Sequence, residues 1–167
     1  MVGIKRLLDS SKREGQNSLQ IIVGRVGSEV AGMKRIFYVF KGSVDSGVGP
    51  LQIEFADGAV LFDAGGDGET LKVSGVRWID PFLAEDPPSE VNKAYVDKYG
   101  KWTAFDVVGS PEYRQFLEGV IQGVVPRKTL DGRLTGVVLQ TTKGDMSVMA
   151  EWDELVVALS PAPENEA

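Results

Sequence analysis

The chain has 167 residues and a formal net charge of −6 at pH 7, with 18 lysines and arginines against 24 aspartates and glutamates. It contains no cysteine and no histidine, which excludes disulfides, thiolate chemistry, imidazole-ligated metals and nucleophile systems that need a histidine base. The acidic balance argues against nonspecific nucleic-acid binding. Because the sequence has no apolar run of 18 residues and no recognisable secretory signal, we expect a cytoplasmic protein that does not enter membranes.

The first elements expected along the chain are a helix and two strands. Residues 4–14 place Ile4, Leu7 and Leu8 on one helical face, and Gly15 is expected to end that helix. The apolar run at residues 19–26 predicts a strand, and the aromatic and β-branched residues at 35–41 predict another. A glycine-rich loop then leads to residue 49.

Residues 49–73 predict a hairpin with Asp57-Gly58 as a two-residue turn, since Asp-Gly favours the type I′ conformation. In that register one face of the hairpin is wholly apolar, with the facing pairs Phe55–Val60, Ile53–Phe62 and Leu51–Ala64. A third strand is expected at residues 71–76.

The second half begins after Pro87-Pro88, which block regular structure and suggest a linker. Ser89 is a suitable N-cap for a helix that reaches Tyr99, with Val91, Ala94 and Tyr95 inward and Gly100 closing it. A strand at 102–108 follows. Ser110 and Pro111 predict a short helix that stops at Gly119. The remaining strands are expected at residues 120–127, 134–142 and 154–159.

A second hairpin, with Lys143-Gly144 as its turn, repeats the pattern of the first when Gly58 is aligned with Gly144. We therefore predict an internal duplication, although two antiparallel hairpins can resemble each other without a repeat. The expected fold class is α+β and mostly antiparallel. Two pseudo-repeated halves, 1–84 and 85–160, would each contain a helix, a strand, a short helix and antiparallel strands with a two-residue hairpin. They would share one core in a single domain, 1–160, followed by a disordered tail, 161–167.

Acidic charge concentrates around the two hairpins. Residues 42–90 contain two basic and ten acidic residues, and residues 144–167 contain six acidic residues and no basic residue. Asp63, Asp67 and Glu69 resemble fragments of calcium-binding loops, but Thr70 stands where a glycine-rich repeat would need an acid. Carboxylate pairs such as Glu54 with Asp63, or Asp80 with Glu85, could do acid–base work across a cleft. The simpler interpretation of all these acids is a solvated surface, so we expect no catalytic, cofactor-binding or metal-binding residues.

Two stretches place large apolar side chains among acids, as in an aromatic-anchored binding loop: residues 78–86 and residues 151–154. The alternative is that Trp78 and Phe82 fill the seam between the halves. The candidate partner-binding residues are Asp67, Glu69, Trp78, Asp80, Phe82, Glu85, Asp86 and Trp152.

The hairpins LQIEFADGAVLFD and VVLQTTKGDMSVM, the connection VRWIDPF and the ending DELVV resemble, over residues 35–159, small bacterial immunity proteins of polymorphic and contact-dependent toxin systems. The resemblance implies a cytoplasmic, non-catalytic protein that binds one cognate toxin domain and occludes its active site. An acidic inhibitor would suit a basic toxin domain. The alternative is a structural or adaptor module that self-associates through its hairpin edges. A ligand-binding protein or a carboxylate-based hydrolase is a third hypothesis.

Overall fold

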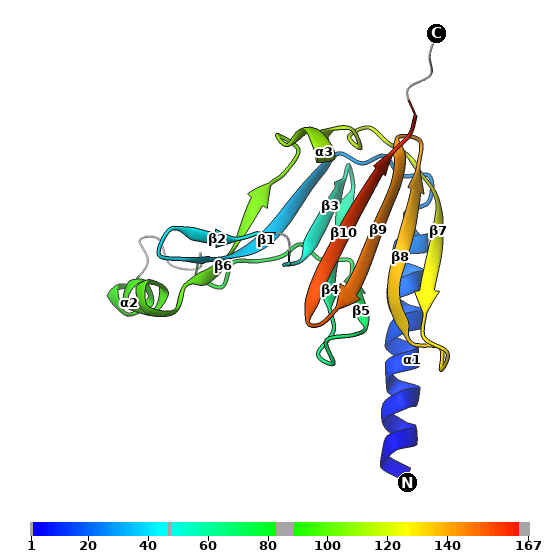
Figure 1. The fold of residues 1–167 in the computed structure, drawn as a ribbon, viewed down its shortest axis with the longest axis horizontal. Coiled ribbons are helices and arrows are strands. Elements are labelled where there is room, and N and C mark those ends of the chain that lie inside the picture. The colour runs from blue at the N-terminus through cyan, green and yellow to red at the C-terminus, as the bar shows by residue number, and fades with distance from the viewer. Residues whose placement is uncertain (1, 47, 83–88, 164–167) are drawn as a thin grey trace.

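A computed structural model of the chain describes residues 2–46, 48–82 and 89–163, with side chains in the first helix from Arg13 onward. The fold is α+β, and its strands form two antiparallel sheets that lie face to face (Figure 1). The predicted linker at Pro87-Pro88, the boundary at 84/85 and the end of the predicted tail at 164–167 lie outside the described residues.

The first sheet has the strand order β2-β1-β3-β4-β5, and β6 pairs with the other side of β1. Its strands are β1 (Gly32–Phe40), β2 (Ser43–Asp45), β3 (Leu51–Phe55), β4 (Gly58–Ala64), β5 (Leu71–Ser74) and β6 (Lys101–Asp106). The second sheet is a four-stranded meander in the order β10-β9-β8-β7. Its strands are β7 (Ile121–Lys128), β8 (Leu134–Thr141), β9 (Gly144–Glu151) and β10 (Glu154–Pro161).

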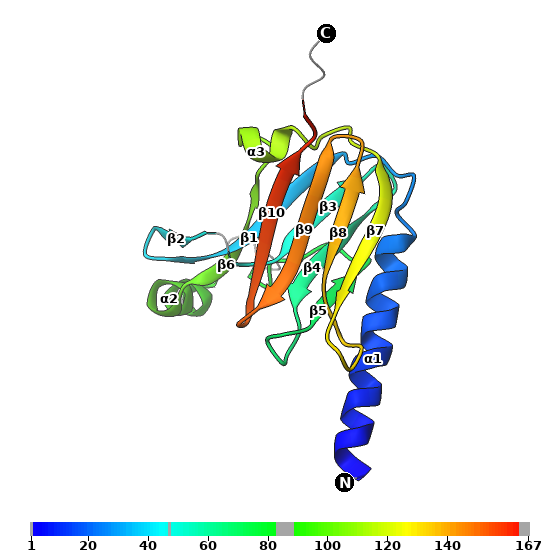
Figure 2. The same cartoon turned by 45° about the vertical axis from the view of Figure 1, so that its right-hand side comes forward.

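One long helix and two shorter ones accompany the sheets: α1 (Val2–Val23), α2 (Glu90–Tyr99) and α3 (Pro111–Arg114). Helix α1 runs along the border between β5 of one sheet and β7 of the other, and its N-terminal part extends beyond both sheets (Figure 2). Within the described residues, no helix combines the length and the apolar character that a membrane crossing requires.

The core lies between the two sheets and α1, as one continuous cluster of buried apolar side chains. Alternate residues of β3, β4, β5, β9 and β10 point into it, as the period of two dictates. From the first sheet these include Met33, Ile53 and Phe62, and from the second Leu139 and Val148. The two sheets and α1 therefore enclose one core.

Helix α1 also covers the edge of the first sheet. Strand β5 lies at the end of the strand order, so its outward backbone groups have no neighbouring strand. The buried Ser18 Oγ accepts a hydrogen bond of 3.0 Å from the Val73 backbone N–H. A helix and one hydroxyl thus protect an edge that could otherwise pair with another chain.

Replacing Ser18 by Ala should leave the Val73 N–H buried without an acceptor, and we expect the free energy of unfolding to fall by about 1–3 kcal/mol. Urea denaturation measures this loss. Gln20→Ala, at an exposed position of the same helix, is the matched control and should unfold with the wild-type midpoint. Equal midpoints for the two variants would contradict the proposed edge contact.

The strand predicted at residues 19–26 is wrong, because α1 continues through Gly15 to Val23. A short apolar run fits a buried helix face as well as a strand, and Leu19 and Ile22 here pack on the core. Gly15 does not end the helix. Its missing side chain lets α1 approach β8, since a Cβ at this position would lie 3.1 Å from the Leu134 Cβ. The predicted face of Ile4, Leu7 and Leu8 lies outside the described side chains.

Both predicted hairpins exist, but each is shifted by two residues from the predicted register. In the first, Phe55 pairs with Gly58 and Ile53 with Val60; in the second, Thr141 pairs with Gly144. The turn residues are therefore 56–57 and 142–143, and none of them has positive φ, so neither turn is type I′. A shift of two preserves the side-chain face, which explains why the predicted inward residues Leu51, Ile53, Phe55, Val60 and Phe62 are buried.

The predicted duplication is not confirmed by this architecture. The meanders β3–β5 and β8–β10 place their first turns at corresponding glycines, but the strand expected at residues 19–26 is mostly helical. Strand β6, from the second half of the sequence, pairs with β1 of the first. The two sheets therefore do not coincide with two halves of the chain.

Helix α2 has the predicted bounds, with Ser89 Oγ accepting from the Asn92 N–H and Gly100 at the C-cap with φ 76°. Its predicted inward face is wrong, since α2 buries no residue and Val91 is exposed. The reason is that α2 contacts Phe82 through the ring of Tyr95 and does not pack on the main core. Figure 1 shows α2 beside β2 and β6, in a lobe formed with this part of the first sheet.

The largest side chain that is fully buried is charged: Arg35 of β1 is 2% exposed. Its Nη1 donates to the Tyr113 hydroxyl at 3.0 Å, and its Nη2 donates to the carbonyls of Gly49 at 2.9 Å and Leu155 at 3.3 Å. Its Nε has no partner, and within the described residues no carboxylate pairs with it. Three neutral acceptors therefore hold one buried cation. They come from the loop before β3, from α3 and from β10.

Tyr113→Phe removes one of these acceptors and leaves the guanidinium less satisfied in a buried site. We expect the free energy of unfolding to fall by about 1.5–3 kcal/mol, the usual effect of losing a hydrogen bond to a charged group. Tyr95→Phe, on the exposed helix α2, keeps its ring contacts and should have little effect. Chemical denaturation of both variants makes the comparison, and a Tyr113→Phe protein as stable as the wild type would refute this role of Tyr113.

Candidate functional site

Three loops meet at one end of the two sheets, and we call this region the acidic end. It consists of the β4–β5 loop (65–70), the β7–β8 loop (129–133) and the β9–β10 turn with its flanking residues (151–154). The Asp153 N–H donates to the Gly68 carbonyl at 2.9 Å, which joins the turn to the β4–β5 loop. Arg133 joins the β7–β8 loop to the same loop through Asp67 and Glu69. These segments all lie at the lower end of the sheets in Figure 1.

Asp67 organises the β4–β5 loop. Its Oδ1 accepts hydrogen bonds from the backbone N–H groups of Glu69 (3.1 Å) and Thr70 (2.9 Å) and from the Thr70 hydroxyl (2.7 Å). The Gly65 N–H donates to the Thr70 carbonyl at 2.7 Å and closes the loop. Aspartate is suited to such turns because its short carboxylate can accept from the backbone two and three residues ahead. The loop therefore has a fixed shape, with Glu69 exposed on it.

The β9–β10 turn consists of Trp152 and Asp153, both in the left-handed region with φ 52° and 65°. These angles match a type I′ turn, for which asparagine and glycine are the preferred residues and a bulky side chain is unfavourable. The indole is 89% exposed, so no packing compensates for the strained backbone. Gly68 is the reason that the turn can dock, since a Cβ there would lie 2.2 Å from the Asp153 Oδ1.

The residues that flank this turn bear like charges. Glu151 and Glu154 are directly paired across β9 and β10, and both are exposed. Like charges opposite each other in a sheet destabilise it. The turn thus combines a strained tryptophan, a solvent-exposed indole and an unfavourable carboxylate pair within four residues.

The β7–β8 loop adds a second exposed apolar side chain and a cation. Leu130, at the tip, is 112% exposed relative to its reference value. Arg133 Nε lies 3.2 Å from an Asp131 carboxylate oxygen, and its Nη1 lies 3.8 Å from Asp67 and 3.9 Å from Glu69. The three segments of the acidic end together contain one guanidinium, that of Arg133, and six carboxylates: Asp67, Glu69, Asp131, Glu151, Asp153 and Glu154.

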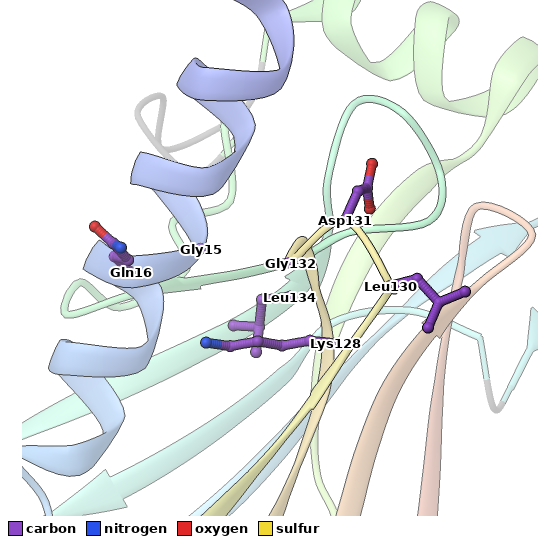
Figure 3. Close-up of a pocket in the computed structure, with 7 residues that line it drawn as sticks. All are labelled: Gly15, Gln16, Lys128, Leu130, Asp131, Gly132 and Leu134. Carbon is purple, nitrogen blue, oxygen red and sulfur yellow. The ribbon is translucent and has the colours of Figure 1, made fainter.

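An open hollow of about 440 Å³ lies beside the acidic end, between α1 and the β7–β8 loop. Gly15 and Gln16 of α1 line one side, and Lys128, Gly132 and Leu134 line the other. Figure 3 shows Lys128 extending toward α1 and Leu130 pointing away from it. Leu130 thus lines the rim of the hollow and points away from α1, and its side chain is exposed to solvent.

Hydrogen bonds keep two of the carboxyls ionised. Burial opposes ionisation of Asp67, but the hydrogen bonds from Thr70 and Glu69 and the charge of Arg133 outweigh it and hold its pKa below the ordinary value. The side-chain hydrogen bond from Thr129 lowers the pKa of Asp131, and Arg133 adds to this effect. The acidic end therefore stays anionic well below neutral pH.

The structure brings together three of the sequence-predicted residues, Asp67, Glu69 and Trp152. Leu130, Asp131 and Arg133 belong to the same surface and were not predicted. An isolated leucine in the turn sequence TLDGR was the available signal, since a large apolar side chain between turn-forming residues has no local structural reason.

Trp78, Asp80 and Phe82 lie elsewhere, between the outer face of the first sheet and α2. The Trp78 N–H donates to the Gln52 side chain, and Phe82 stacks on Tyr95 with ring centres 5.9 Å apart. The Asp80 side chain is only 5% exposed and pairs with Lys101 at 2.7 Å. Its carboxylate is therefore already paired within the protein. Glu85 and Asp86 lie outside the described residues.

Of the two carboxylate pairs considered for acid–base chemistry, Asp80 with Glu85 cannot be placed, because Glu85 lies outside the described residues. Glu54 is opposite Ala59, and Asp63 is opposite Lys72, so Glu54 and Asp63 do not face each other across the strands. In the part of the chain that the structure describes, no group of three acidic residues is arranged to hold a metal ion.

The fold and site define an α+β protein of two antiparallel sheets, with acidic and apolar side chains displayed together on the loops at one end. Comparison of the chain with protein-family models, with curated proteins and with solved structures found no match.

Asp67→Asn should weaken the β4–β5 loop in a pH-dependent manner. Because the folded-state pKa of Asp67 is lower than its ordinary value of 3.8, the ionised carboxylate stabilises the fold above that pH, and this contribution is lost as the pH falls through the folded-state pKa. We expect the variant to be less stable by about 1 kcal/mol at pH 7, with the difference disappearing below pH 3.8.

Urea denaturation at pH 7, 5 and 3 tests this expectation. Asp145→Asn is the control, since Asp145 is exposed on β9 and the described structure gives its side chain no partner. A stability difference for Asp67→Asn that stays constant over this pH range would contradict the assignment.

Proposed function

We propose that this protein is an immunity-type inhibitor that binds a cognate toxin domain through the acidic end and occludes its active site. The sequence resemblance to small bacterial immunity proteins supports the proposal. In it, the chain acts in the cytoplasm by binding alone, without catalysis, and its partner is a protein with a basic surface.

The observation that carries the proposal is the β9–β10 turn. Trp152 occupies a backbone conformation that disfavours it, exposes its ring, and lies between two opposed glutamates. Residues held at such local cost are concentrated at functional sites, because stability there is given up for activity. A partner with a basic surface and a pocket for the indole would relieve both the exposure and the repulsion.

The surrounding surface has the composition of a protein-binding site. Trp152 and Leu130 supply apolar anchors, and tryptophan is enriched among residues that dominate binding energy. The carboxylates around Arg133 supply a strong negative field. Toxin domains that act on nucleic acids or nucleotides carry positive charge where they bind substrate, and complementary charge accelerates association. The inhibitor and the substrate of the toxin would then bind the same basic region, so that binding of the inhibitor occludes the active site.

A double substitution separates the function of the turn from its structure. Trp152→Asn with Asp153→Gly creates the Asn-Gly sequence that a type I′ turn prefers. We expect the free energy of unfolding to rise by roughly 1–2 kcal/mol, since the left-handed strain is relieved. Binding to the cognate domain, measured by titration calorimetry, should weaken at least 100-fold.

The β1–β2 turn provides a matched control. Lys41 and Gly42 also have positive φ, 47° and 75°, so Lys41→Asn creates the same Asn-Gly turn in the lobe that carries α2. This variant should gain stability and keep full binding. The partner is obtained by capturing the tagged protein from the cells that encode it, and it is identified as a toxin by its activity with and without the inhibitor. A captured protein that the Trp152 and Asp153 variant binds as tightly as the wild type would sink the proposed site.

A further inference from the structure

The outer edge of β10 is open. Hydrogen bonds to β9 use the even-numbered residues 154–160, so the backbone groups of Leu155, Val157 and Leu159 point away from β9. Leu155 is satisfied, because its N–H donates to the Val48 carbonyl at 2.9 Å and its carbonyl accepts from Arg35. Within the described residues, the N–H and C=O groups of Val157 and Leu159 have no partner on that side. Figures 1 and 2 both show β10 at the outer border of its sheet.

This edge lacks the features that usually prevent an edge strand from pairing with a strand of another chain. Residues 155–160, LVVALS, contain no charge and no proline. Soluble proteins protect open edges with lysines, prolines, bulges or a covering helix, as α1 does for β5. The two sheets therefore differ: one edge is covered within the chain, and the other is left able to pair.

An apolar stripe on the outward face of the second sheet reaches the same edge. Val125 is opposite Val138, and Met149 is opposite Val156. Met149 also lies over Gly136, where a Cβ would be 2.1 Å from its sulfur. Val125 and Val156 remain substantially exposed at the two ends of the stripe. Exposed apolar surface that continues to an unpaired edge is typical of an interface.

We propose that β10 pairs antiparallel with β10 of a second copy of this chain, in a two-fold dimer whose axis passes through Ala158. In this register Val157 of one copy is opposite Leu159 of the other, and every free N–H and C=O of these two residues meets its complement. The pairing ends where Leu155 is already bonded and where Pro161 has no N–H to donate. Glu154 is opposite Ala162 of the second copy, so no like charges meet.

The dimer joins the two second sheets into one continuous sheet and extends the apolar stripe across it. Ala158 is small, which lets the two copies approach closely at the axis. Because β10 begins at the acidic end and the strands are antiparallel, the two acidic ends face in opposite directions. The interface therefore leaves both sites free, and it does not depend on the proposed toxin-binding function.

The test is the mass of the purified chain by light scattering after size exclusion, over a range of concentrations up to about 1 mM. The wild type should approach twice the monomer mass of 18.1 kDa. Ala158→Lys brings two ammonium groups together at the axis and should give monomers. Ser147→Lys is the matched control, since Ser147 is the β9 residue directly opposite Ala158 on the same face; this variant should remain dimeric.

A charge swap tests the register itself. Ala158→Lys and Ala158→Glu proteins should each be monomeric alone and should form a mixed dimer when combined, because opposite charges then meet across the axis. Circular dichroism verifies that each variant is folded. A wild type that stays monomeric at all concentrations, or Ala158→Lys and Ser147→Lys variants with the same mass, would overturn the proposal.

Discussion

The interaction on which the rest of the structure depends is the binding of the Arg35 guanidinium by three neutral oxygens. A buried cation without a carboxylate is costly, and it persists only where every acceptor is held firmly in place. Gly49, Tyr113 and Leu155 come from distant parts of the chain, so the same contacts that satisfy the charge also bind the first sheet to β10. Two residues before Leu155, Asp153 bonds to Gly68. The position of the acidic end thus follows from the start of β10, which Arg35 fixes.

The acidic end combines a rigid base with unfavourable exposed groups. The Asp67 hydrogen bonds and the Gly68–Asp153 contact hold the loops in one arrangement. On this base stand an exposed indole, an exposed leucine and opposed carboxylates. In a flexible loop the carboxylates could move away from one another and reduce their repulsion, but the hydrogen bonds of this surface prevent such a movement. Such preorganisation reduces the entropy lost on binding, which is the advantage of building a recognition surface on short, well-bonded turns.

Local signals in the sequence predicted what local interactions determine. Ser89 and Gly100 bounded α2 correctly, and the alternation in the hairpins identified the buried face. The register was missed because Gly58 and Gly144 end their turns instead of forming them. The helix at residues 19–23 was missed because its apolar run fits either period. The strand that begins at Arg35 was predicted, but no local signal indicates the burial of this arginine, which depends on Tyr113 and Leu155, more than 70 residues away. The acidic end forms from three loops through tertiary contacts, so sequence could name Asp67, Glu69 and Trp152 but not place them together.

The contact between Arg35 and the Leu155 carbonyl also constrains the order of events during synthesis on the ribosome. Arg35 is synthesised 120 residues before Leu155, its acceptor in β10. The nascent chain therefore carries a guanidinium that cannot yet be enclosed, in a strand whose neighbour β6 is also still to come. Closure of the core has to wait until β10 has been synthesised, as expected for a topology rich in distant strand pairings. Until then, the positive charges of Lys34 and Arg35 keep this segment hydrated, which lowers the risk that exposed strands associate before β10 arrives.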